Sequence, residues 1–472
     1  MKLQPSLIAL LLALLTDCTP QYKVTRRLAS LPDIFPDYCG VTVPQQIAPL
    51  HFRVNARAGE AVGARFVSDN GEETTVSASD GSVCISRSRW QALLDGAGKV
   101  TVEVMVKQGD AVCAYRPFDI LVSPDPIDPY IAYRKIEPGY TNWYKMGLYQ
   151  RQLSTFDEEP LVENTSTGNN CINCHTFCQA DPRKMAFHMR GEMAGTWLLQ
   201  GDGRPVKCFA GNDTVRSLVY PSWHPSGRFI AYSTNDTHQT FHSSSANRIE
   251  VFDEKSDIVV LDLDPGAPQL FSSPLIATAS SWETYPCFSP DGKTLYFCTA
   301  DSVAMPQRYK EVKYSICSIA FDAAKKKFGD RVDTLLSART VGKSMVMPRV
   351  SPDGKWMVVT VSDYGCFPIW HHEADLYIVN LRTRAVRPLA AANSRDTESY
   401  HSWSSNGRWL LFASRRVNGL YTMPYLCHIA PDGRASKPFL LPQDDTDYYD
   451  RCLKSYNIPE FVKGKIHLST PR

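Results

Sequence analysis

A repeat in the second half of the chain constrains the fold more than any other feature of its 472 residues. Four segments resemble one another, each with a short apolar run, a turn rich in Pro, Ser, Asp and Gly, and a second alternating run. They begin at Tyr220, Tyr285, Met347 and Tyr400. Their turn glycines are Gly227, Gly292, Gly354 and Gly407, spaced 65, 62 and 53 residues apart. Repeated units of this kind indicate a propeller or another repeat architecture.

Each segment predicts a β-hairpin, because glycine supplies the positive φ that its turn needs and the alternation marks both arms as strands. A third strand-like run follows in every copy, at 257–263, 314–322, 375–381 and 423–430. Each repeat therefore predicts a four-stranded blade. A partial blade precedes them at 185–210, and 461–468 is the candidate for the strand that completes it and closes the ring. The expected count is five blades, with six as the alternative.

The repeat resembles the TolB-type, WD-like propeller repeat over residues 220–440, most specifically in its Ser-Pro-Asp-Gly-Lys turns. The first copy departs from that pattern with Ser226, and the last with Ser405 and Asn406. These residues still suit a turn. The resemblance implies a TolB-like β-propeller over residues 185–470.

Two further parts precede the propeller, and the whole chain is predicted to be all-β. Residues 40–125 alternate β-rich runs with Gly, Asp and Asn turns, which is typical of a small Ig-like β-sandwich, with one helical insert at 88–96. Residues 126–184 open with closely spaced prolines and predict an extended linker that joins the domains or walls a cofactor. Its aromatic residues are Tyr130, Tyr133, Tyr140, Trp143, Tyr144 and Tyr149.

The motif that carries chemistry lies in this linker. Residues 171–175 read Cys-Ile-Asn-Cys-His, the Cys-x-x-Cys-His signature of c-type haem attachment. On one helical turn, positions i, i+3 and i+4 share a face, so both thiols reach the vinyl groups of one porphyrin while the imidazole lies beneath its iron. We expect one covalent haem c, with Cys171 and Cys174 as thioether residues and His175 as the proximal iron ligand.

Three other chemistries remain open for this motif. A thioredoxin-like redox pair would require a βαβ pattern, which the sequence lacks. A zinc site would need further ligands, for which Cys178, Cys208 and His188 are near enough in sequence. A structural disulfide between the two motif thiols is the third.

The sixth ligand of a haem iron would come from the run that follows the motif, residues 185–193. On a strand, His188 and Met189 point to opposite faces, so at most one of them can face the iron. His188 is the favoured distal ligand, and Met189 or Met185 are the alternatives. Arg190 shares the face of His188, where it either pairs with a propionate or is solvated.

The N-terminus predicts export. Lys2 precedes an apolar stretch over Leu7–Leu15, which has the length of a signal-peptide core and is too short to span a bilayer. The sequence Leu-Thr-Asp-Cys that ends at Cys18 resembles a bacterial lipobox, which implies lipidation of Cys18 after removal of residues 1–17; a plain cleaved signal peptide is the alternative. The formal net charge of +2 gives no reason to expect nucleic acid as a partner.

The block at 125–195 followed by a propeller resembles exported Bacteroidetes proteins described as TolB-like or cytochrome-related. We expect a lipid-anchored monohaem cytochrome of the periplasm or the periplasmic face of the outer membrane, which exchanges electrons with an envelope protein or redox partner docked on its propeller. It would be an electron carrier rather than a hydrolase, since no Gly-x-Ser-x-Gly sequence occurs. The alternatives are a propeller binding or scaffold module whose haem or metal segment is structural or sensory, and an oxidoreductase with an open sixth site.

Overall fold

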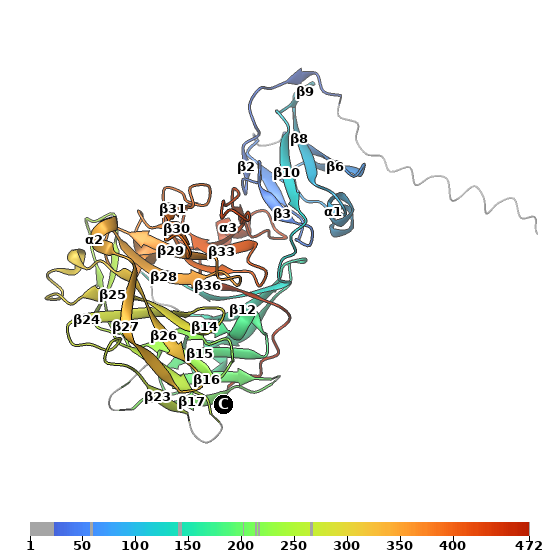
Figure 1. Ribbon diagram of the computed structural model, residues 1–472. Coiled ribbons are helices and arrows are strands. Elements are labelled where there is room, and N and C mark those ends of the chain that lie inside the picture. Colours follow the sequence, from blue (N-terminus) through green and yellow to red (C-terminus); the bar gives the residue numbers. More distant parts are fainter. Residues whose placement is uncertain are drawn as a thin grey trace, which may run out of the picture. The chain divides into compact units, whose positions relative to one another are not determined.

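The computed structural model describes residues 23–56, 60–139, 144–201, 203–212, 215, 218–264 and 268–471 (Figure 1). Cys18, Tyr140 and Trp143, which the sequence singled out, lie outside these residues. No helix in the described ranges is long and apolar enough to cross a membrane. The chain divides into two compact units, one formed mainly by residues up to Leu121 and the other mainly by residues from Val122 onward.

The first unit is a small β-sandwich. One sheet contains β1 (Arg26–Arg27), β9 (Ala111–Ala114), β8 (Lys99–Gln108), β10 (Phe118–Ser123), β5 (Val62–Ser68) and β6 (Glu73–Ala78), and the other contains β2 (Ile34–Phe35), β4 (Phe52–Val54) and β7 (Ser82–Val83). Phe52 of the small sheet meets Phe66 of the large one with ring centroids 6.5 Å apart. The expected helical insert is α1 (Arg87–Leu94), whose Trp90 packs edge-on against Phe66 and covers one end of this core.

The second unit consists of six four-stranded antiparallel sheets, and the strands of each are named from the innermost outward. The first three blades are β14 (Cys171–Phe177), β15 (Lys184–Arg190), β16 (Gly195–Gln200), β17 (Val206–Phe209); β18 (Val219–Trp223), β19 (Phe229–Ser233), β22 (Ile258–Asp262), β23 (Gln269–Phe271); and β24 (Ser281–Phe288), β25 (Thr294–Asp301), β26 (Ser315–Asp322), β27 (Lys327–Leu336). The others are β28 (Ser344–Val350), β29 (Trp356–Ser362), β30 (Asp375–Asn380), β31 (Val386–Pro388); β32 (Glu398–Trp403), β33 (Trp409–Ser414), β34 (Met423–His428), β35 (Phe439–Leu440); and β36 (Ser455–Val462), β11 (Tyr130–Ile136), β12 (Gly147–Gln152), β13 (Glu158–Glu163).

The innermost strands form a closed ring, which makes the unit a six-bladed propeller. Each of β14, β18, β24, β28, β32 and β36 contacts the next, and β36 returns to contact β14. A two-stranded extension, β20 (Asp236–Phe241) with β21 (Ile249–Lys255), projects from the second blade. Short elements outside the blades are β3 (Thr42–Pro44), α2 (Ala338–Val341) and α3 (Tyr448–Arg451).

The described residues form six blades, so the expected count of five is wrong and the alternative count of six is confirmed. The blade that the sequence analysis overlooked is the sixth. Residues 130–163, predicted as an extended linker, form three of its strands. The closely spaced prolines Pro124, Pro126 and Pro129 lie before β11, and Tyr130–Ile136 itself contains no proline. The closing strand is β36, which pairs with β11; residues 461–468 do not complete the blade at 185–210, whose inner strand is β14.

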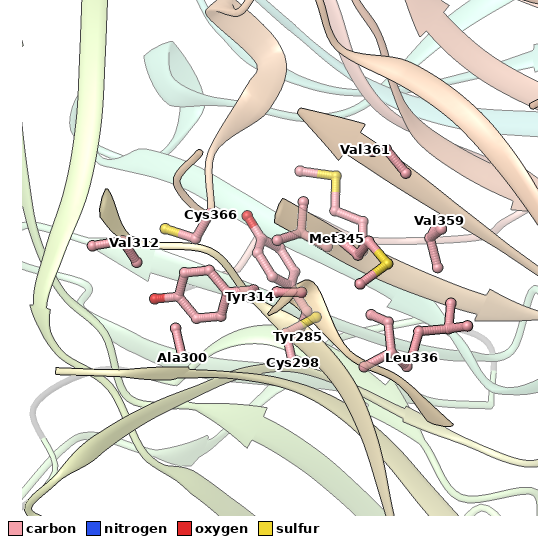
Figure 2. Packing of buried hydrophobic residues seen from close by; sticks show 14 of the residues in the cluster. Tyr285, Cys298, Ala300, Val312, Tyr314, Leu336, Met345, Val359, Val361 and Cys366 are labelled. Carbon is pink, nitrogen blue, oxygen red and sulfur yellow. The ribbon is translucent and has the colours of Figure 1, made fainter. Parts of the chain in front are cut away.

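Apolar side chains fill the space between adjacent blades. Figure 2 shows the cluster between the third and fourth blades, where Tyr285, Tyr314 and Met345 meet from three strands or connections. Burying each such side chain contributes roughly 1.5–3 kcal/mol. Cys298 lies in the same cluster with none of its surface exposed. As expected for small buried hydrophobic residues, Cys287, Cys317 and Cys427 are also buried, and every cysteine in the described ranges is a free thiol.

Candidate functional site

The inner strands share one backbone irregularity, which sets the shape of the channel between them. In each strand one residue has a left-handed φ of 47° to 56°, and the pairing with the next strand shifts register there. The six residues are Cys174, Tyr220, Tyr285, Met347, Tyr400 and Ile458. A bulge of this kind bends a strand and redirects the side chains that follow. Cys174 of the motif therefore occupies, in the first blade, the position that Tyr220, Tyr285, Met347 and Tyr400 occupy in the repeats.

Three adjoining cavities follow the channel. The thiol-side cavity, about 630 Å³, is lined by residues that include Cys171 and Arg134. The throat, about 30 Å³, is lined by the left-handed residues, their immediate successors, and Arg349 and Glu460. The far cavity, about 410 Å³, begins at Thr176 and Phe177. The thiol-side cavity and the throat share Cys174, Tyr220, Tyr400 and Ile458, and the throat and the far cavity share Arg349 and Glu460.

The motif lies on the strand β14 and not on the helical turn that the haem hypothesis assumed. The reason is that residues 171–177 pair with β15 as the inner strand of a blade. On a regular strand, Cys171 and Cys174 would point to opposite faces because their separation is odd. The left-handed Cys174 interrupts that alternation, and both Cys171 and Cys174 line the thiol-side cavity.

Cys174 and His175 are both buried, with exposures of 5% and 1%. Burial raises the pKa of the Cys174 thiol. Burial lowers the pKa of His175 to about 3, and the charges of Arg134 and Arg349 act in the same direction. Neither ring nitrogen of His175 has a hydrogen-bond partner among the described residues. His175 is thus a neutral imidazole with unused nitrogens, the state in which histidine ligates a metal.

Aromatic and cationic side chains surround the thiols. Trp370 lines the thiol-side cavity, and the guanidinium of Arg415 lies 3.4 Å from the centre of its ring. Arg134 donates a hydrogen bond of 2.5 Å to Oδ1 of Asn173, inside the motif. Arg190 lines the same cavity. The thiol-side cavity therefore combines aromatic walls with three arginines and two carboxylates, Glu137 and Asp236, and its arginines suit a planar ligand that carries carboxylates.

The candidate distal ligands do not line any of these three cavities. They lie on β15, the second strand of the blade, behind β14. Met185 and Met189 are buried in the core shared by the first and sixth blades. His188 pairs with Asn173 in register, and burial lowers its pKa to about 4. The methionine that lines the throat together with His175 and Cys174 is Met347, which was not among the candidates taken from the sequence.

The zinc alternative gains no support from the geometry. Within the described ranges, no group of three His, Cys, Asp or Glu side chains is close enough to hold a metal ion. Cys178 lies near the carbonyl of His224, whereas Cys208 lies near that of Thr196, and neither joins the motif thiols.

Nothing among protein-family models matches the chain, and no curated protein matches it. Solved structures that resemble it include a puromycin-hydrolyzing peptidase from Mycobacterium tuberculosis (11% identity, 86% of this chain, 57% of that one, TM-score 0.38). A second is a putative 6-phosphogluconolactonase from Bacteroides uniformis (13% identity, 67% of this chain, 98% of that one, TM-score 0.34). A third is a periplasmic gluconolactonase from Pseudomonas aeruginosa (12% identity, 69% of this chain, 99% of that one, TM-score 0.35). The chain thus spans 57% of the length of the peptidase. At these TM-scores the likenesses carry no argument about function, and the propeller architecture follows from the strand pairing itself.

Proposed function

We propose that the protein binds one c-type haem covalently through Cys171 and Cys174 and serves electron transfer. The observation that carries this proposal is that Cys171 and Cys174 both line one cavity of about 630 Å³, next to a neutral His175 whose ring nitrogens make no hydrogen bond of good geometry within the described residues. That volume lies within the roughly 300–1,000 Å³ of cofactor and ligand sites. The group would supply an iron that cycles between the ferric and ferrous states.

The residues around the thiols have roles that suit such a group. Arg134, Arg190 and Arg415 offer charged donors for its two carboxylates. Trp370, Tyr220 and Tyr400 offer apolar faces, and the closed wall of inner strands limits access of water from the throat side. His175 would approach such a group from the throat, where its ring nitrogens make no hydrogen bond of good geometry within the described residues, although the backbone of Ala132 and Ile458 lies near the ring.

The apolar leader and Cys18 support a place in the bacterial envelope as part of the same proposal. A lipid on Cys18 would hold the propeller at the periplasmic side of a membrane. The partner would be an envelope redox protein that docks where the thiol-side cavity opens, since electrons must pass close to the bound group.

The test is an optical spectrum of the full chain expressed in a host with c-type cytochrome maturation. We expect a sharp α-band after dithionite reduction and a haem stain that survives denaturing electrophoresis. Cys171→Ala with Cys174→Ala should abolish the stain, whereas Cys427→Ala, which alters a buried thiol of the fifth blade, should leave it unchanged. A colourless wild-type protein, or a stain that persists in the double variant, would contradict the proposal.

One observation favours a second candidate function. His175 lines the throat, whereas the cavity that both thiols share lies on the other side of Cys174. Without a haem, the same walls would make the propeller a binding module for an organic anion, held by Arg134 and Arg190. A colourless protein whose thermal midpoint rises with added organic anions, and rises less in Arg190→Gln, would select this candidate.

A further inference from the structure

The far cavity has a composition of its own, set by equivalent positions in the six blades. Two residues after each left-handed residue, the inner strands contribute Thr176, Ser222, Cys287, Arg349, Ser402 and Glu460 to its wall. All six positions are described by the structure, and two of them are charged. One position further along stand Phe177, Trp223, Phe288, Val350, Trp403 and Phe461, which line the cavity as well. Arg349 and Glu460 thus lie in a chamber whose wall combines an aromatic ring of side chains with hydroxyl groups, and a second cation, Lys463, lines it as well.

Arg349 and Glu460 approach each other across the channel, from β28 and β36. Nη2 of Arg349 lies 3.7 Å from Oε1 of Glu460, which is too long for a hydrogen bond. Glu460 is anchored elsewhere, because its Oε2 accepts a hydrogen bond of 3.2 Å from the backbone N–H of Phe177. Among the described residues, no acceptor is hydrogen-bonded to the guanidinium of Arg349, whose side chain remains 31% exposed. Its forked donors are available to a ligand.

We infer that the far cavity binds a small organic acid with an aromatic or apolar body, whose carboxylate pairs with Arg349. Guanidinium groups recognise carboxylates through two parallel N–H donors, and the aromatic ring of residues around Arg349 would enclose the body of the acid. The volume of about 410 Å³ fits a molecule of this size and not a folded partner. Glu460 would compete with the ligand for Arg349 because it presents a carboxylate to the same guanidinium.

This site is separate from the thiol-side cavity, since the throat of about 30 Å³ lies between them. No residue that lines the far cavity is a motif thiol or His175. The inference therefore holds whether or not the chain carries a haem.

The test is calorimetric titration of 3-phenylpropionate into the full-length protein, with 3-phenyl-1-propanol as the uncharged counterpart. We expect a Kd on the order of 0.1–1 mM for the acid and weaker binding of the alcohol. Arg349→Gln should weaken the acid about tenfold or more and leave the alcohol unchanged. Glu460→Gln should tighten the acid several-fold. Arg384→Gln is the matched control, because this exposed arginine pairs with Asp333 at the outer part of the propeller.

Three results would overturn the inference: no binding of the acid up to about 10 mM, equal affinity for acid and alcohol, or equal affinity of the acid for wild type and Arg349→Gln. Far-UV circular dichroism checks that each variant is folded. If Arg349→Gln does not fold, Glu460→Gln decides alone, and an unchanged or weaker affinity in that variant counts against the inference.

Discussion

At the scale of single residues, the left-handed positions connect the motif to the rest of the chain. Residues 174–177 read Cys-His-Thr-Phe and occupy the same place as Tyr-Pro-Ser-Trp at 220–223 and Tyr-His-Ser-Trp at 400–403. This alignment is difficult to recognise in the sequence, because the turn that follows Phe177 lacks the glycine of the other repeats. Where the repeats use glycine, the first blade uses Gln179 and Ala180, both at positive φ. The Cys-x-x-Cys-His motif could therefore be recognised in the sequence, whereas its position on a strand that lines the channel could not be predicted.

The pH dependence of Glu460 provides a residue-scale prediction. Burial raises the pKa of Glu460 to about 7 in the folded protein, from an ordinary value of 4.5. The stability linked to this proton is fully present below pH 4.5 and is lost as pH rises through 7. We expect Glu460→Gln to gain stability relative to wild type across that range, by up to about 3 kcal/mol.

The measurement is urea unfolding of both proteins at several pH values between 4.5 and 8. Glu159→Gln is the control, since its carboxylate is 49% exposed and pairs with Lys465 at the surface. Charged groups near Glu460 are Arg349 on β28 and Lys463 beyond the same strand, while burial keeps His175 and His401 neutral. A difference in unfolding free energy that stays constant with pH would show that Glu460 is not titrating with this pKa.

At the scale of elements, the repeat pattern predicted the strands that are joined by a glycine turn. It did not predict the strands that lack such a turn. The hairpins that begin at Tyr220, Tyr285, Met347 and Tyr400 are all present as β-strand pairs. The strands β11–β13 lack such turns, and their aromatic residues lie in the packing of a blade rather than on the extended linker that the sequence predicted. Tyr133, for example, is fully buried and lies 4.8 Å from the ring of Tyr456 on β36.

The β20–β21 extension is fastened to the fourth blade by a buried ion pair. His371, in the connection before β30, lies 2.8 Å from Glu250 on β21 and 3.3 Å from Glu373. Burial opposes the charge of His371, but the two carboxylates outweigh burial and raise its pKa to about 9. His371 is buried although it lies in a connection between strands, and Glu250 from another blade pairs with it there.

We expect His371→Gln to destabilise the protein by roughly 2–4 kcal/mol at pH 6, since Glu250 would be left buried without its cation. The stabilising effect of protonated His371 is complete below pH 6.5 and disappears as pH rises through 9, so the gap between wild type and variant should narrow by pH 9.5. Chemical unfolding at the two pH values measures this gap. His238→Gln, at a histidine that is 49% exposed, should show little effect at either pH; a gap that does not narrow would contradict the assignment.

At the scale of the whole molecule, the number of blades depended on segments that are far apart in sequence. The sixth sheet combines β11–β13, from residues 130–163, with β36, from residues 455–462. No local pattern links these segments, so counting the visible repeats gave five. The all-β class and the propeller itself followed from the repeats, because their turns and alternation are local properties.

The closing strand should control the stability of the entire ring. Val462 on β36 is fully buried and pairs with Tyr130 on β11. We expect Val462→Asp to cost about 3–5 kcal/mol, because it buries an unpaired carboxylate. Circular dichroism and tryptophan fluorescence should lose their signals together at lower urea concentration. Ser469→Asp, at an exposed residue just beyond, should leave the midpoint unchanged. Separate transitions would indicate that the sixth blade opens by itself.

Closure of the ring also sets the order in which strands can pack during synthesis, because the closing strand β36 comes last in the sequence. The strand that lies against the Cys-x-x-Cys-His strand on one side is β36, which the ribosome makes about 280 residues after Cys174. Until then, Cys174 and His175 are open on that flank. Docking of the last strand therefore covers one flank of Cys174 and His175, which are 5% and 1% exposed in the closed ring.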